Sequence, residues 1–309
     1  MIGYEIIISI KNGNFAFSKL SKMNHFFEHF IITQFNLLQF PKSSVSDNDS
    51  WFLWTRKRFA IFWEYCFPSV LQQKTKQFKW LIYFDTATPS EFNEQISELQ
   101  KYDFINICYA DKYDDFNFRY MKDVQQKASP DTQWFITSRL DNDDCLHCSA
   151  MERIQKEFAP NDKFMISLSL GYVLDMESRK MSKYCYPMSP FISLVEKNTD
   201  SMLGIYHKEH ASWNLKLYIF KELYNRYFVK KEKRNVCFVL DEILWIQLYH
   251  KENVSNSFYR GFPVLRSNNL ISFGLNVIST PSSFWMIPKY YNYVMWKRYF
   301  KAFMVRVLG

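Results

Sequence analysis

The sequence predicts an α/β protein in which a mostly parallel β-sheet is flanked by helices. Two observations support this fold class. Short segments rich in aromatic and β-branched residues alternate with longer amphipathic segments, as in proteins built from βαβ units with right-handed crossovers. Acidic and amide residues directly follow several of the short apolar segments. In open sheets of this kind ligands bind beyond the carboxyl ends of the strands.

The first half of the chain carries the clearest alternation. Each expected strand is a run of apolar residues bounded by polar ones. The helix after the second strand begins at Thr88-Pro89-Ser90-Glu91, where Thr88 is expected to cap the helix and Glu91 to complete a capping box. The expected strands are residues 29–35, 78–84, 104–109 and 134–138, and the expected helices are residues 54–71, the segment that starts at Thr88, and residues 118–127.

The second half shows a similar but looser pattern. Apolar residues recur at helical spacing from Leu146 to Phe158, a strand is expected near residues 164–170, and an amphipathic helix near 213–228. The apolar segment 236–240 precedes Asp241 and Glu242, where a further helix is expected to begin. At the N-terminus, only a possible strand at residues 4–10 stands out.

Composition limits the classes of protein that fit. A chain of 309 residues with 48% hydrophobic residues can bury one large α/β core or two ordinary ones. It has only 7 glycines and neither glycine-rich phosphate-binding motif, so a nucleotide must be held in another way. The six cysteines are scattered, and no apolar run reaches the roughly 20 residues of a membrane span. Without a signal peptide pattern, we expect a cytoplasmic protein.

The acidic stretch after residues 134–138 is the main candidate site. Arg139 and Leu140 are followed by Asp141, Asn142, Asp143 and Asp144. In an extended segment Asp141 and Asp143 would point to the same side, about 7 Å apart along the chain. Two such carboxylates suit Mg²⁺ or Mn²⁺, which can offset the charge of a leaving diphosphate. The alternative is a solvated acidic turn in which Asp144 caps the next helix.

Three further features leave alternatives open. Asp241, or Glu242 beside it, is a candidate general base, although acids are also favoured at a helix start by the helix dipole. Cys145-Leu-His-Cys148 resembles half of a zinc site but lacks a second pair of ligands, so we interpret it as incidental. Arg58 and Arg139 can bind phosphate oxygens or form structural ion pairs.

The C-terminal tail carries most of the net charge of +8. Residues 253–309 contain seven basic residues and no acidic residue, and nine aromatic residues lie between positions 284 and 303. Basic and aromatic side chains together favour the surface of an anionic membrane. The alternative is a helix packed on the core with a solvated basic face.

With these residues laid out, the chain resembles a family of bacterial rhamnosyltransferases, glycosyltransferases with the GT-A nucleotide-sugar fold. The similarity extends over about residues 29–262. It is carried by residues 29–36, 58–69 with Gln73, 78–85 with Thr88 and Pro89, 138–144, 191–196, and 245–250 with Asn253 and Asn256.

The resemblance implies a domain organisation and a set of site residues. It implies an unassigned extension at residues 1–28, a GT-A domain at 29–280 with a nucleotide-binding half at 29–145 and an acceptor-binding half at 146–280, and a basic aromatic helix at 281–309. Asp141 and Asp143 would bind the metal and Asp241 would act as the base. The expected donor-binding residues are Thr33, Asn36, Arg58, Asp85, Arg139, Asp141 and Asp143, and the expected sugar- or acceptor-binding residues are His250, Asn253 and Asn256.

The implied activity is metal-dependent transfer of a deoxyhexose. The donor is expected to be a nucleoside diphosphate sugar such as dTDP-L-rhamnose, and the acceptor a hydroxyl of a surface polysaccharide or a lipid-linked glycan. Peripheral association with the cytoplasmic face of the inner membrane fits such an acceptor. The alternatives are a different donor, such as a UDP-hexose, and a non-catalytic protein whose basic tail binds nucleic acid or membrane. No nucleic-acid-binding motif is present, so no nucleic-acid partner is expected.

Overall fold

The structure is a computed structural model that describes residues 26–37, 48–187, 189–207, 235–250 and 261–283. Several predicted features lie outside these residues. They are the strand at 4–10, the helix at 213–228, the residues Asn253 and Asn256, and nearly all of the extension at 1–28 and of the helix at 281–309.

The larger of two sheets has seven strands in the order β10-β6-β9-β4-β1-β2-β3. All neighbouring pairs are parallel except those that β9 makes with β4 and β6. The mostly parallel sheet predicted from the sequence is therefore confirmed. Its strands are β1 (Phe27–Gln34), β2 (Lys79–Asp85), β3 (Ile105–Ala110), β4 (Trp134–Arg139), β6 (Phe164–Leu168), β9 (Ile192–Lys197) and β10 (Val236–Val239).

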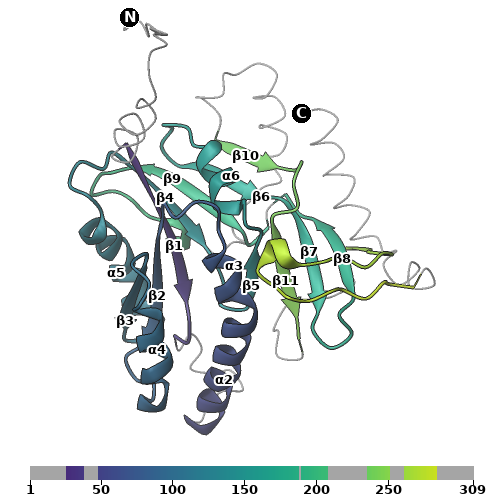
Figure 1. The fold of residues 1–309 in the computed structure, drawn as a ribbon. Coiled ribbons are helices and arrows are strands. Elements are labelled where there is room, and N and C mark those ends of the chain that lie inside the picture. The colour runs from purple at the N-terminus through teal and green to yellow at the C-terminus, as the bar shows by residue number, and fades with distance from the viewer. Residues whose placement is uncertain (1–25, 38–47, 188, 208–234, 251–260, 284–309) are drawn as a thin grey trace, which may run out of the picture.

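Helices cover both faces of this sheet (Figure 1). One face packs on the helices of the α2 side, where Phe59, Phe62 and Ile96 join the core cluster of Ile31 and Ile82. The other face packs on α5. The elements are α2 (Asn48–Ile61), the π-helical η1 (Phe62–Cys66), α3 (Phe67–Leu71), η2 (Ser90–Phe92), α4 (Asn93–Leu99), α5 (Lys112–Lys127), α6 (Ala150–Lys156) and the 3-10 helix η3 (Ile205–His207).

A second, five-stranded sheet lies beside the first (Figure 1). Its order is β12-β8-β7-β11-β5, and only β7 and β11 run parallel. Trp245 joins the two sheets, because its fully buried ring stacks on Phe191 and its Nε1 donates to the Leu168 carbonyl at 2.6 Å. The strands are β5 (Asp144–Leu146), β7 (Leu170–Asp175), β8 (Met181–Cys185), β11 (Trp245–Tyr249) and β12 (Phe262–Pro263), with the 3-10 helix η7 (Ile271–Phe273) nearby.

The order of the strands defines where a ligand should bind. From β1 the chain moves outward through β2 to β3 and then returns to place β4 on the other side of β1. The connection after β1 leads toward β2, whereas the chain after β4 leads toward β6 on the other side. The point between β1 and β4 where the strand order reverses is a topological switch point, and ligands bind in the crevice at the carboxyl ends of the strands there. The acidic stretch directly follows β4, so it lies at this switch point.

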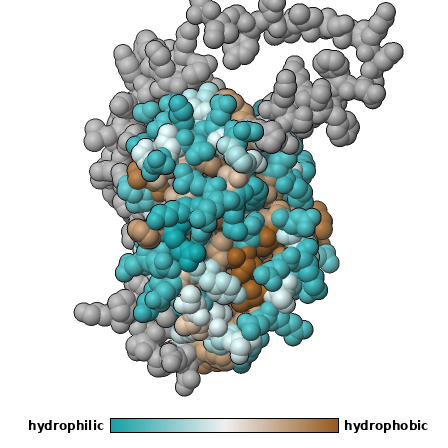
Figure 2. All heavy atoms as spheres, turned by 90° about the vertical axis from the view of Figure 1, so that its left-hand side faces the viewer, coloured by the Kyte–Doolittle hydropathy of each residue, from teal (hydrophilic) through white to brown (hydrophobic). Residues whose placement is uncertain are grey.

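The strand β3 forms one edge of the larger sheet, and no described strand lies beyond it. This part of the molecule faces the viewer in Figure 2, where the surface is mostly hydrophilic with a patch of hydrophobic side chains. Tyr109 of β3 is 43% exposed at this edge.

Several local expectations were wrong. The segment from Leu146 is not one helix, because residues 144–146 pair with β11 and the helix α6 begins only at Ala150. No helix begins at Asp241, because residues 241–244 form a short bend between β10 and β11. Thr88 does not cap a helix, since its hydroxyl donates to the Asp85 carbonyl at 2.5 Å. The helices expected at 54–71 and 118–127 both begin six residues earlier.

A buried histidine gives this sheet a predictable dependence on pH. The Nε2 atom of His29 lies 2.7 Å from Ser138 Oγ, and burial lowers the pKa of His29 to about 3. Below about pH 6.5 the unfolded chain binds a proton here that the folded protein does not. The free energy of unfolding should therefore fall by about 1.4 kcal/mol per pH unit between pH 6.5 and 3.

The variant His29→Gln should lose this part of the pH dependence. Urea unfolding at pH 7.5 and pH 5.0 measures it, and the wild type should lose about 2 kcal/mol more than the variant over this interval. Equal losses in both proteins would show that His29 is protonated in the folded state.

Candidate active site

The acidic stretch forms a tight turn where the chain passes from the first sheet to the second. The amide of Asp144 donates to the Asp141 carbonyl at 3.2 Å, and Asn142 Nδ2 donates to the Phe35 carbonyl at 2.6 Å. The extended arrangement expected for Asp141 and Asp143 is therefore wrong, since the chain must reverse between β4 and β5. Each carboxylate has its own basic partner instead.

Asp143 is held from both sides. Arg58 of α2 forms an ion pair with Asp143 Oδ2, and His250 Nε2 lies 3.1 Å from the same oxygen. The antiparallel register of β5 and β11, which pairs Asp144 with Gln247, carries His250 to this position. The guanidinium of Arg58 also lies 4.9 Å from the ring centre of Trp54. The structure thus brings together three of the predicted site residues.

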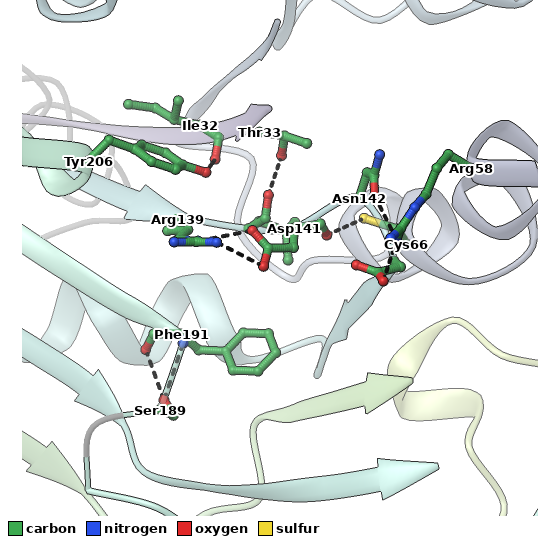
Figure 3. A network of polar contacts seen from close by, with 12 residues as sticks. Ile32, Thr33, Arg58, Cys66, Arg139, Asp141, Asn142, Ser189, Phe191 and Tyr206 are labelled. Atoms are coloured by element: carbon green, nitrogen blue, oxygen red, sulfur yellow. Dashed lines mark hydrogen bonds and ion pairs between the residues drawn. The ribbon is translucent and has the colours of Figure 1, made fainter. Parts of the chain in front are cut away.

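Asp141 pairs with a different arginine. Arg139 Nε and Nη2 donate to the two oxygens of Asp141 at 2.9 and 3.1 Å, and the guanidinium lies 5.2 Å from the ring centre of Tyr206 (Figure 3). The Tyr206 hydroxyl in turn donates to the Ile32 carbonyl at 3.2 Å. The side chain of Asp141 is 36% exposed, against 11% for Asp143. Asp141 is therefore the more accessible carboxylate of the pair.

The pKa values of Asp143 and Asp144 are shifted in opposite directions. Burial of Asp143 opposes ionisation, but the His250 hydrogen bond and the Arg58 charge outweigh it and lower the pKa of Asp143. Burial, and then the charges of Asp143 and Asp141, raise the pKa of Asp144 well above its usual range. Asp144 is therefore the acid of this turn that the surroundings keep protonated.

The other expected donor-binding residues lie inside the protein. Thr33 is fully buried, where its hydroxyl donates to the Leu140 carbonyl at 2.8 Å and accepts from Trp80 Nε1 at 2.9 Å. Asn36 accepts from the Asp85 amide at 3.0 Å, and Asp85 Oδ1 accepts from the Ala87 amide at 2.9 Å. These side chains shape the carboxyl ends of β1 and β2.

Asp241 follows β10, at the same edge of the sheet as the acidic turn after β4. Its side chain is 63% exposed, and Arg153 of α6 donates to its Oδ2 at 2.8 Å and to Glu242 at 3.1 Å. The hydrogen bond from Arg153 lowers the pKa of Asp241. No contact of Asp241 with Asp141 or Asp143 occurs among the described residues, so the structure does not join it directly to the acidic turn.

Sequence reasoning missed residues that fix the geometry of this site. Asn142 and Tyr206 were overlooked because their partners are far away in the sequence. Cys66 lies at the end of the π-helical turn, and its thiol donates to the Asp141 carbonyl at 3.7 Å. Such π-turns are frequent at functional sites. In the sequence, the only signal for Cys66 was its place within residues 58–69, one of the segments that carry the family resemblance.

The carboxylates of the acidic turn are chemically suited to a hard divalent cation. Within the described residues, no three His, Cys, Asp or Glu side chains form a group able to hold a metal ion. Mg²⁺ is usually held by one or two carboxylates together with substrate phosphates, and Asp141 offers a partly exposed carboxylate of this kind. The donor set therefore fits a cation shared with a diphosphate.

The fold defines a mixed α/β protein whose mostly parallel sheet is flanked by helices and carries an acidic turn at the carboxyl end of β4. The chain belongs to the family described as "Putative rhamnosyl transferase", whose model matches residues 53–259.

The solved structures to which the chain is similar are distant from it. TarS residues 1–349 from S. aureus is 10% identical with a TM-score of 0.38, covering 72% of this chain and 60% of that chain. A longer S. aureus TarS structure is 8% identical with a TM-score of 0.32, covering 72% and 37%. The 4-diphosphocytidyl-2C-methyl-D-erythritol synthase from Anaerococcus prevotii DSM 20548 is 12% identical with a TM-score of 0.26, covering 74% and 88%. No curated protein matched the chain.

Proposed function

We propose that this glycosyltransferase moves a deoxyhexose, L-rhamnose from dTDP-L-rhamnose, onto a hydroxyl of a surface polysaccharide or lipid-linked glycan. The observation that carries the proposal is the acidic turn at the switch point in a chain of the rhamnosyl transferase family. Membership of that family also favours a transferase over the non-catalytic nucleic-acid binder.

In this proposal the acidic turn receives the diphosphate of the donor. A Mg²⁺ or Mn²⁺ ion would be held by Asp141 and Asp143 and would supply positive charge for the leaving diphosphate. Arg58 and His250 keep Asp143 ionised and fixed in place. Arg139 orients Asp141 through two parallel hydrogen bonds, which restrict the carboxylate more than one bond would.

Asp241 is the proposed general base for the acceptor hydroxyl. Support comes from its position at the carboxyl edge of the sheet and from its exposure. The hydrogen bond from Arg153 lowers the pKa of Asp241, so the carboxylate is ionised at neutral pH, as a general base must be, although the same bond makes it a weaker base.

The variant Asp241→Asn tests this role. It should lower kcat about 100-fold or more, as expected for loss of a general base, and leave donor binding unchanged. Asp175→Asn, at the end of β7, is the control. An unchanged kcat in Asp241→Asn would show that Asp241 is not the general base.

A thermal-shift screen tests the proposed donor. The full chain is heated with dTDP, UDP and their sugars, each with and without Mn²⁺. A ligand at 100 times its Kd stabilises the folded state by about 2.7 kcal/mol. A metal-dependent shift with dTDP-L-rhamnose, absent in Asp141→Ala, is the expected result. A shift with UDP-hexoses alone would identify a UDP-hexose as the donor in place of dTDP-L-rhamnose. The absence of a shift with every nucleotide would overturn the proposal.

Membrane association is proposed from the tail alone, which lies almost wholly outside the described residues. None of the helices in the described ranges is long and apolar enough to cross a membrane. Flotation of the full chain with anionic vesicles, compared with a truncation at Thr280, tests peripheral membrane binding. Equal flotation of the two proteins would count against it.

A further inference from the structure

A hollow of about 650 Å³ lies between α5 and the segment at residues 199–207. This volume is within the range of about 300–1,000 Å³ that small-molecule sites occupy. The hollow belongs to the α5 side of the larger sheet, away from the face on which α2 packs. None of the predicted site residues that the structure describes lines it.

The described part of the lining is aromatic and polar and carries little charge. Tyr113, Phe118 and Tyr206 contribute rings, and Asn117, Gln125 and Thr199 contribute amide and hydroxyl groups. Of the described lining residues other than His207, only Lys122 and Asp200 are charged at neutral pH, one of each sign. The Lys122 ammonium lies 3.8 Å from the centre of the Phe118 ring. A diphosphate would require more positive charge, whereas a neutral sugar chain needs apolar faces and hydrogen-bonding groups.

The wall formed by residues 199–207 is held in place by hydrogen bonds to Glu196 and Tyr120. The buried carboxylate of Glu196 accepts from the amides of Leu203 at 3.1 Å and Gly204 at 2.8 Å. The Tyr120 hydroxyl donates to the Leu203 carbonyl. Gly204 has φ of +70°, and a Cβ there would lie 2.3 Å from Met121 Sδ. This wall is therefore formed before any ligand binds.

The hollow is joined to the acidic turn by one side chain. The ring of Tyr206 lines the hollow and also lies against Arg139, which binds Asp141 (Figure 3). Because Tyr206 is buried between the two, a glycan in the hollow would be bound outside the acidic turn at which the donor is proposed to react.

We propose that the hollow binds a neutral stretch of the acceptor glycan, at sugar units removed from the hydroxyl that is glycosylated. The inference rests on the proposed function, because it assigns a glycan as acceptor. It adds a second binding surface built from α5 and residues 199–207, which selects the acceptor by its sugar units rather than by its reacting hydroxyl.

The experiment uses the full chain and an array of bacterial surface oligosaccharides. Phe118→Ala removes an exposed ring from the hollow, and Asn117→Trp fills it; Phe118 is 72% exposed, so its removal should leave the fold intact. Tyr109→Ala, which removes an exposed ring of β3 outside the hollow, is the matched control. Binding of the array glycans should fall at least tenfold in the first two variants and remain unchanged in the third.

Donor binding separates this inference from the proposed function. The thermal shift with dTDP-L-rhamnose and Mn²⁺ should be the same in all three variants. Loss of that shift in Asn117→Trp would assign the hollow to the donor and overturn the inference, as would glycan binding no stronger in the wild type than in Asn117→Trp. Normal glycan binding without any nucleotide shift in the wild type would instead overturn the proposed donor chemistry alone.

Discussion

Replacement of Asp141 by Ala should lower the rate of sugar transfer by about 10³-fold, because the charge stabilisation that a bound cation supplies is worth several kcal/mol. Asp141 is the more exposed carboxylate of the acidic turn, and its carboxylate pairs only with the neighbouring Arg139 among the contacts described above. Its removal should therefore affect the chemistry more than the fold. The rate of transfer from dTDP-L-rhamnose and the thermal unfolding temperature measure the two effects.

The control for this prediction is Asp103→Ala. Asp103 is an exposed carboxylate just before β3, at the opposite edge of the sheet from the acidic turn. Its removal should change neither rate nor stability. A rate in Asp141→Ala within threefold of that in Asp103→Ala would exclude Asp141 from metal or diphosphate binding.

Replacement of Arg58 by Met should have the largest effect on stability at the site. It leaves the buried carboxylate of Asp143 without the arginine that balances its charge, and such a loss typically costs about 3–5 kcal/mol. The free energy of unfolding in urea measures this loss. Arg56→Met is the matched control on the same helix, because Arg56 forms an exposed ion pair with Glu91 and should contribute less than about 1 kcal/mol.

The double variant Arg58→Met with Asp143→Asn tests the physical cause. If the cost comes from an unbalanced buried charge, neutralising Asp143 should restore most of the lost stability, even though it removes another native group. Additive losses in the double variant would show that Arg58 stabilises the fold by packing against Trp54. Equal losses in Arg56→Met and Arg58→Met would exclude a special role for the buried pair.

Much of the larger sheet could be predicted from the sequence. The strands β1 to β4 lie within two residues of the expected ranges, because each is a short run rich in aromatic and β-branched residues, most of them buried. Such runs carry their signal within a few neighbouring residues. The position of Asp141 and Asp143 at the end of β4 follows from the same pattern and from the order of strands and helices.

Other parts could not be predicted because their signal is spread over distant residues. The pairing of β5 with β11 depends on contacts across about a hundred residues, and it converts an expected helix near Cys145 into a strand. The same pairing turns the expected helix at Asp241 into the bend before β11. Local helical spacing at these positions was overridden by burial between the two sheets.

The sequence by itself determined the fold class, the βαβ order and the acidic residues that end β4. Only the tertiary structure decided how these acids are used. In the folded protein Asp143 contacts Arg58 and His250, and Asp141 is hydrogen-bonded to Arg139, whose guanidinium lies against Tyr206. Thr33 and Asp85 are buried in the interior. The physical reason is that the charge of a buried carboxylate depends on its neighbours in space, and these neighbours come from helices and strands up to 107 residues away.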